Sequence, residues 1–357
     1  MESSISRRSM LRGSALIFGA AAASGIAGWP AGPAAARPWK HRSTFVPGAD
    51  WYDTWGNLIE AHTGGMYVEN GTYYWVGANW QGKYGFQKFN LYSSTDLARW
   101  EFVSTVLEPS SDLPTNHEVA RPKILYNGLT DSYVMWFKRK DYAASFNDVR
   151  PGVATSKTLD GPFEFLTDFY PGADPQYNAA DFCLWQEPDG TAYYIASSPN
   201  VRGGEYDRRI IMFRLTPDYR GLEPEPVYVG PSDGREAPAV FERLGTYYLV
   251  TSGTSGWTAN QSAYRTAPSL LGPWSDLEDL GDVTTYDSQP DFILPVHGKA
   301  KTTYLYAGGR HLQEALGDSR YVWLPLTFSG DRLTLDYYDS WSLDPRTGVW
   351  HSGRDGS

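Results

Sequence analysis

The segment LGTYYLVT, residues 244–251, recurs along the chain with small changes, and it decides the predicted fold. Each copy is a turn followed by a short strand led by tyrosine. The copies are NGTYYWVG (70–77), TDSYVMWF (130–137), DGTAYYIA (189–196), LGTYYLVT (244–251) and AKTTYLYA (300–307). Their leading tyrosines lie 54 to 60 residues apart. Such a period indicates one structural unit that is used five times.

A second shared pattern follows each copy and completes the unit. It reads as a strand, a short turn and an edge strand marked by Gly-Pro or by an aromatic residue. A unit therefore holds about four short strands and no amphipathic helix of useful length. Because four-stranded units repeated radially form a propeller, we predict an all-β, five-bladed β-propeller with four-stranded blades. A β-sandwich does not need the same unit five times, and β-helix repeats are much shorter.

The first 36 residues have the order of an export signal. Arg7 and Arg8 precede a small, apolar run over residues 13–27, and three alanines at 34–36 match a cleavage site. The run is too short for a membrane span, so we expect a twin-arginine signal and a secreted or extracytoplasmic protein. The propeller then fills residues 37–357 as one domain, with an irregular tail from about Leu343.

Composition excludes some partners. The formal net charge of −10 argues against nucleic acid and anionic membrane surfaces. The single cysteine, Cys183, allows no internal disulfide and lies in an apolar segment typical of a buried thiol. Aromatic residues make up 15% of the chain, which fits sugar binding but also an all-β core. We assign no cofactor and no metal, and we expect a monomer. A structural calcium ion is the alternative, although no calcium loop of EF-hand type supports it.

The strand before each repeated turn carries a polar residue at nearly the same position. In a propeller these strands are innermost, so their polar side chains should converge on one end of the central channel. They are His62, Arg121, Asp181, Glu236 and Gln289.

Glu236 stands out because it heads an apolar run, residues 237–241. A buried carboxylate without partners is costly, and burial raises its pKa. Such a group can serve as a general acid near neutral pH. The alternative is a structural ion pair, for example with Arg235 or Arg121.

Several blocks of this sequence resemble glycoside hydrolase family 43, whose members are five-bladed propellers that hydrolyse glycosides with inversion. The blocks are ARPKILYN (120–127), DFCLWQEPDGTAYYIAS (181–197), EAPAVFERLGTYYLVTSGTSGW (236–257), TTYDSQPDFILP (284–295) and SRYVWLPLTF (319–328). The resemblance runs from about Asp53 to Trp341 and is strongest to the branch of exo-β-1,3-galactanases. It implies a polysaccharide or oligosaccharide substrate.

The resemblance also implies catalytic roles. Glu236 matches the general acid, and Asp181 matches the carboxylate that orients the acid and tunes its pKa. Most of the family has an aspartate base where this chain has Glu60-Ala61-His62. The galactanase branch lacks that base and holds the attacking water with a glutamine, which Gln289 matches. Glu60 and Asp53 are the fallback bases.

The predicted substrate-binding residues come from several blades. They are Glu60, His62, Glu118, Arg121, Asn200, Thr254 and Trp257. Glu60 is expected to bind sugar hydroxyls in preference to acting as a base, and His62 to be a hydrogen-bond donor or a structural group.

Other residues have a structural alternative. Trp80, Trp257 and Trp323 are either stacking platforms or core residues. His311 is a further candidate for the channel wall. Asp287-Ser288-Gln289 and Arg310 can equally form a structural network between blade 5 and blade 1.

One departure from the branch affects the predicted substrate. Relatives have a glutamate directly before R-P-K, where this chain has Ala120. Glu118 lies two residues earlier, on the same face of an extended segment. The leading hypothesis is an exo-acting β-1,3-galactanase or galactosidase that degrades arabinogalactan-type polysaccharide. The alternatives are an α-L-arabinofuranosidase or a β-D-galactofuranosidase, and a propeller that binds sugar without catalysis.

Overall fold

The computed structural model describes residues 43–82, 85–141, 148–173, 176–199 and 208–353. The predicted export signal, residues 1–36, and Asn200 lie outside these ranges. Within them the chain is all-β, with one short 3-10 helix, η1 (Leu316–Asp318). No helix in the described ranges is long and apolar enough to cross a lipid bilayer.

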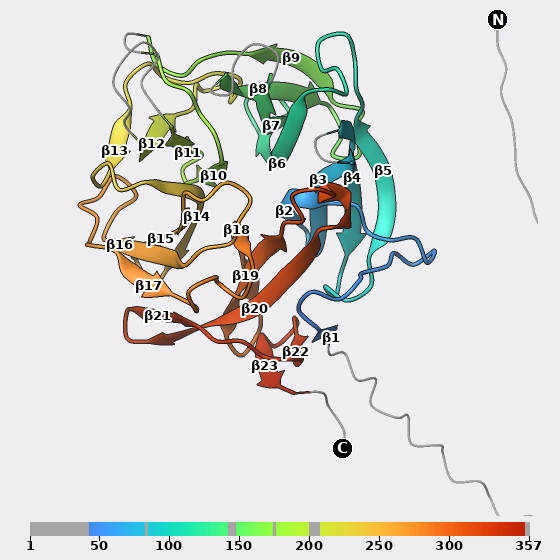
Figure 1. Cartoon of the computed structure of the whole chain (residues 1–357), viewed down its shortest axis with the longest axis vertical. Coiled ribbons are helices and arrows are strands. Elements are labelled where there is room, and N and C mark those ends of the chain that lie inside the picture. Colours follow the sequence, from blue (N-terminus) through green and yellow to red (C-terminus); the bar gives the residue numbers. More distant parts are fainter. Residues whose placement is uncertain (1–42, 83–84, 142–147, 174–175, 200–207, 354–357) are drawn as a thin grey trace, which may run out of the picture. The chain divides into compact units, whose positions relative to one another are not determined.

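Five sheets have four antiparallel strands each, in sequence order (Figure 1). The first contains β2 (His62–Glu69), β3 (Thr72–Gln81), β4 (Gly85–Ser94) and β5 (Glu101–Leu107). The second contains β6 (Glu118–Asn127), β7 (Ser132–Lys140), β8 (Val149–Ser156) and β9 (Glu164–Asp168). The third contains β10 (Phe182–Gln186), β11 (Ala192–Ser198), β12 (Arg209–Arg214) and β13 (Val227–Val229). The fourth contains β14 (Arg235–Arg243), β15 (Thr246–Gly253), β16 (Ser262–Ala267) and β17 (Glu278–Leu280). The fifth contains β18 (Gln289–His297), β19 (Thr302–Arg310), β20 (Arg320–Ser329) and β21 (Arg332–Leu335).

The first strands of these sheets lie innermost. Each contacts the first strand of the next sheet, from β2 through β6, β10 and β14 to β18, and β18 contacts β2 again. The leading tyrosines of the repeats fall on the second strands, β3, β7, β11, β15 and β19. The β-propeller with four-stranded blades is therefore confirmed, and so is the inner position of the strand before each repeat.

A sixth sheet corrects the predicted number of blades. It has three strands, β1 (Ser43–Phe45), β22 (Trp341–Asp344) and β23 (Val349–Ser352), with β22 in the middle. The structure thus has six blades, not five, and the tail predicted to be irregular is paired. The search for repeats missed this sheet because two distant parts of the chain build it and neither contains the repeated segment.

Glycine shapes the turns between first and second strands. At Asn70-Gly71 both φ angles are positive, 50° and 77°, and at Leu244-Gly245 they are 53° and 84°. Two successive positive φ angles define the two-residue hairpin turn that matches strand twist, and glycine adopts this conformation without strain. In these two copies the repeated turn is therefore the hairpin that places the inner strand beside its partner.

Aromatic side chains fill the core between the blades. Trp75, Trp100, Trp323 and Trp341 are each at most 2% exposed. Trp75 contacts Trp100 edge-on with ring centroids 5.5 Å apart, and Trp323 lies 5.1 Å from Trp75. Cys183 is buried and unpaired, and burial raises the pKa of its thiol to about 12, as expected of a structural thiol.

Candidate active site

Bulges on the inner strands direct polar side chains toward the channel. The pairing of β2, β6 and β14 with their second strands shifts register between residues 62 and 65, 120 and 123, and 236 and 239. At these shifts Thr63, Arg121 and Ala237 have positive φ angles of 47°, 57° and 50°. A bulge bends the strand and re-aims the neighbouring side chains, so the same irregularity in three blades builds one site.

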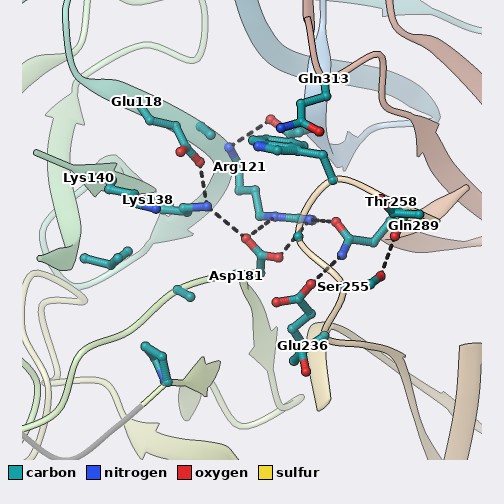
Figure 2. A pocket seen from close by; sticks show the side chains of 18 of the residues that line it. Glu118, Arg121, Lys138, Lys140, Asp181, Glu236, Ser255, Thr258, Gln289 and Gln313 are labelled. Carbon is teal, nitrogen blue, oxygen red and sulfur yellow. Dashed lines mark hydrogen bonds and ion pairs between the residues drawn. The ribbon is translucent and has the colours of Figure 1, made fainter. Parts of the chain in front are cut away.

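A cavity of about 490 Å³ lies where these strands meet. Seven of the predicted site residues line it, and Figure 2 shows five of them with their side chains pointing toward one another. The seven are Glu118, Arg121, Asp181, Glu236, Thr254, Trp257 and Gln289. The structure therefore brings together all three predicted catalytic residues.

Arg121 is the centre of the buried network and is 3% exposed. Its Nε and Nη2 donate to the two carboxylate oxygens of Asp181, at 2.8 and 3.1 Å. Nη2 also donates to Oε1 of Gln289 at 2.7 Å, and Nη1 donates to Oδ1 of Asp291 at 3.1 Å. The planar guanidinium thus holds one carboxylate through two hydrogen bonds and orients the amide beside it.

Asp181 and Glu236 are buried carboxyl groups whose pKa values move in opposite directions. Burial alone raises the pKa of Asp181, but the charges of Arg121 and Lys138 outweigh it and hold that pKa well below its usual range. Burial raises the pKa of Glu236 to about 7, and the negative charge of Asp181 adds to this effect. Opposite shifts in neighbouring carboxyl groups are the pattern of an acid beside a permanently ionised partner.

Glu236 has protein partners at both carboxylate oxygens. Nε2 of Gln289 donates to Oε1 at 3.1 Å, and the guanidinium of Arg208 donates to Oε2. Arg208 lowers the pKa of Glu236, opposing the larger effect of burial. The carboxyl group therefore changes its ionisation near neutral pH, as a proton donor requires.

Gln289 is presented by a strained turn. Thr285, Tyr286 and Asp287 have positive φ angles of 50°, 58° and 57°, although consecutive left-handed residues other than glycine are unfavourable. Arg310 secures the turn, since its Nε and Nη2 donate to the backbone oxygen of Tyr286 at 3.1 and 3.0 Å. Gln289 then donates to Ser252 Oγ at 3.0 Å as well as to Glu236.

The structural network predicted as the alternative role of residues 287–289 and Arg310 is partly present. Arg310 and Ser288 both bond within or beside the turn, Ser288 through the backbone oxygen of Thr285 at 2.6 Å. Asp287 is exposed. The turn therefore supports Gln289 from within the fifth sheet.

Glu60, His62 and Asp53 lie outside the lining of this cavity. Nε2 of His62 lies 2.7 Å from Oε2 of Glu60. Asp53 Oδ1 accepts from the backbone N–H groups of Trp55 and Asn57 at 2.9 and 2.8 Å, so its carboxylate shapes a loop and does not reach the site. This geometry removes Asp53 as a fallback base.

The three candidate tryptophans differ in position. Trp80 and Trp323 are 4% and 2% exposed and belong to the core. Trp257 lines the cavity, with its ring 6.3 Å from Trp80 and 5.1 Å from His311, both edge-on. Trp257 is therefore the one stacking candidate of the three that faces the cavity.

Sequence reasoning missed four charged residues at or beside the site. Lys138, Lys140 and Arg208 line the cavity, and Asp291 lies behind it against Arg121. Lys138 and Lys140 are on β7, opposite Ala120 and Glu118 of β6. Residues that pair across two strands lie on the same face of the sheet. The two lysines in KRK (138–140), two positions apart, could therefore have been predicted to lie on the same face as Glu118.

The family model of glycosyl hydrolases family 43 matches residues 62–304. Because this match spans more than half of the chain and contains the inner strands of five blades, the chain belongs to glycosyl hydrolase family 43. It is a glycoside hydrolase. A search of curated proteins finds no significant match.

Solved structures of this family are similar over most of the chain. An exo-β-1,3-galactanase from Clostridium thermocellum has 35% identity and a TM-score of 0.81, over 88% of this chain and 69% of that one. The exo-β-1,3-galactanase from Phanerochaete chrysosporium, solved as a variant with β-1,3-galactotriose, has 32% identity and a TM-score of 0.78, over 87% and 71%. A β-1,3-galactosidase solved with galactodeoxynojirimycin has 28% identity and a TM-score of 0.73, over 83% and 99%.

The pKa of Glu236 predicts the pH dependence of hydrolysis. On the prediction that Glu236 is the general acid, its protonated form is the active one, so kcat/KM is expected to fall as pH rises through about 7. Replacing Arg208 with Met removes a charge that lowers this pKa, so the decline should move to higher pH. Profiles of kcat/KM between about pH 5 and 9 check this. Arg99→Met, at a largely exposed arginine, is the control. If the decline of kcat/KM in the Arg208 variant stays at the same pH or moves to lower pH, Glu236 is not the group that causes it.

Proposed function

We propose that this chain is an inverting, exo-acting β-1,3-galactanase or galactosidase that acts on arabinogalactan-type polysaccharide. The observation that carries the proposal is the pair formed by Glu236, with a pKa of about 7, and Asp181, which remains ionised, in one buried cavity. The similar structures support the substrate, since two of them are exo-β-1,3-galactanases and one of these was solved with β-1,3-galactotriose.

Each of the three catalytic residues has a separate role in the proposed reaction. Glu236 donates its proton to the glycosidic oxygen as the bond to the sugar breaks. A water held by Gln289 attacks the anomeric carbon from the opposite face and releases its surplus proton to the solvent, because the neutral amide of Gln289 accepts none. The charge of Asp181 helps to keep the pKa of Glu236 raised. Inverting glycosidases place the two sides roughly 6.5–9.5 Å apart so that sugar and water fit between them. Because Gln289 Nε2 bonds directly to Glu236 in this structure, that hydrogen bond has to break when substrate enters.

Product analysis on a defined β-1,3-galactan tests the proposal. We expect galactose as the first product, released as the α-anomer when proton NMR follows the reaction from its start. Aryl α-L-arabinofuranosides and β-D-galactofuranosides test the alternative enzymes that Ala120 suggested. Release of arabinose or of galactose from a furanoside, with none from the galactan, would overturn the galactanase proposal. Sugar binding without product from any substrate would favour a binding module.

Gln289→Ala is expected to lower kcat on β-1,3-galactan by about 10²-fold or more, because the attacking water loses the group that positions it. Steady-state kinetics with Gln289→Glu as a second variant check this, since a carboxylate restores an acceptor at the same place. Gln186→Ala, at a glutamine outside the cavity, is the control. Undiminished turnover of Gln289→Ala would discard this residue as the water-binding group.

We also propose that residues 1–36 direct export and that the mature protein is a monomer. The support is the order of Arg7-Arg8, the apolar run and the alanines at 34–36. Cell fractionation of the wild-type chain and of a variant with lysine at both arginines tests export, and loss of export in the variant is the expected result. Light scattering on the purified protein tests the oligomeric state.

A further inference from the structure

The cavity holds more positive than negative side chains among the described residues. Its cations are Arg121, Lys138, Lys140 and Arg208, and its carboxyl groups are Glu118, Asp181 and Glu236. This excess runs against the chain as a whole, whose formal net charge is −10. Figure 2 shows Lys138 and Lys140 side by side on one wall of the cavity.

Arg121 and Lys138 are paired with carboxylates of the cavity. Arg121 binds Asp181 through two hydrogen bonds. Lys138 Nζ lies 2.6 Å from Glu118 Oε1 and 3.2 Å from Asp181 Oδ1. Among the described residues that line the cavity, these pairs leave Glu236 as the carboxylate that pairs with Arg208.

The charge of Arg208 is therefore balanced by Glu236, the proposed acid. Its guanidinium donates to Oε2 of Glu236, while its Nε is buried and has no hydrogen-bond partner in the described part of the chain. Catalysis requires Glu236 to carry a proton, and a protonated carboxyl group no longer balances the charge of Arg208. A half-buried cation without a counter-charge is costly, and the hydroxyl groups of galactose do not supply one.

Lys140 adds to the positive charge of the same wall. It lies on β7 two residues after Lys138 and is 9% exposed. Burial and the charge of Lys138 lower its pKa, the charges of Glu118 and Asp181 oppose this shift, and the charge of Arg208 adds to it. A negative group that enters the cavity here gains from both Lys140 and Arg208.

We propose that this site accepts a galactan chain carrying an anionic substituent, a uronic-acid carboxylate or a sulfate ester, and that Lys140 and Arg208 bind the anion. This inference rests on the proposed function and specifies its substrate class. Binding of the anion draws the guanidinium of Arg208 from Glu236, so substrate arrival frees the acid to hold its proton. Neutral β-1,3-galactan remains a substrate, with a weaker affinity.

Calorimetry on the full chain carrying Glu236→Gln measures binding without turnover. The ligands are β-1,3-galactotriose, the same trisaccharide with a glucuronosyl substituent, and the same trisaccharide with a sulfate ester. We expect one charged ligand to bind at least tenfold more tightly than the neutral one at low salt, because its anion gains charge-assisted hydrogen bonds to Lys140 and Arg208. The tighter of the two identifies the substituent. Equal or weaker binding of both charged ligands overturns the inference.

Lys140→Met removes the charge and keeps the length of the side chain. In the Glu236→Gln background it should weaken binding of the charged ligand about tenfold and change binding of the neutral one by less than about twofold. Lys140→Arg should retain the preference, which separates loss of charge from loss of fold. Lys157→Met, at a lysine in an exposed turn, is the control of equal charge. An equal loss for both ligands in Lys140→Met overturns the inference.

Turnover distinguishes this inference from the proposed function. Hydrolysis of neutral β-1,3-galactan without any preference for charged ligands overturns the anionic site and leaves the galactanase proposal standing. If no β-1,3-galactan, charged or neutral, releases galactose, the proposed function itself is overturned.

Discussion

Glu236→Gln is expected to lower kcat on β-1,3-galactan by about 10²- to 10⁴-fold, the usual contribution of a general acid. The amide fits the same volume and can keep the hydrogen bond to Gln289, but it has no proton to give to the leaving oxygen. Binding of β-1,3-galactotriose should persist. Steady-state kinetics and calorimetry on the same preparation measure both quantities.

The leaving group separates loss of the acid from general damage to the site. A dinitrophenyl leaving group departs without protonation, so Glu236→Gln should be impaired far less on a dinitrophenyl β-galactoside than on the polysaccharide. Glu242→Gln, on the same strand but outside the cavity, is the control. An equal loss of kcat on both substrates would show that Glu236 does not act as the proton donor.

Arg121→Met is expected to lower the free energy of unfolding by about 3–5 kcal/mol, the cost of leaving a buried ion pair with one partner. The substitution deprives Asp181 and Asp291 of the guanidinium that they share, and both carboxyl groups are at most 7% exposed. Burial already raises the pKa of Asp291 to about 6, so this carboxyl group is expected to take up a proton in the variant. Urea denaturation at neutral pH measures the loss.

Two further variants make the result specific. Arg99→Met removes an arginine that is 78% exposed and paired with Asp96, and should cost no more than about 1 kcal/mol. Arg121→Lys keeps the charge without the planar fork and should be intermediate, which covers the case in which Arg121→Met does not fold. A loss below about 1 kcal/mol in Arg121→Met would contradict the central place of this residue in the network.

The fold was predictable from sequence where it depends on local turn chemistry. The turns at Asn70-Gly71 and Leu244-Gly245 carry their hairpin signal in two residues, and the tyrosine-led strands that follow repeat it. The number of blades was not predictable in the same way. The sixth sheet forms from pairing between Ser43–Phe45 and Trp341–Asp344, and no local pattern marks either segment.

The site was predictable where a side chain heads an inner strand. Glu236 and Gln289 were found from register alone, and the resemblance added their roles. The bulges were not predictable from sequence. Arg121 is the extra residue of the bulge after Ala120, and its residue type does not indicate its positive φ angle. Lys138 and Arg208 were missed because the register argument covers only first strands, whereas the cavity also takes side chains from β7 and from the segment before β12.

The sheet of β1, β22 and β23 has a consequence for the order of folding. Within the described chain, β1 pairs with β22 alone, and Phe45 stacks on Trp341 with ring centroids 4.3 Å apart. A ribosome therefore releases the beginning of the domain long before its partner strand exists. Pairing between such distant segments is slow, since a long loop must close first. We therefore expect β1 to be among the last strands to pair. In a chain truncated before Trp341, β1 would have an unpaired edge that other nascent chains can bind.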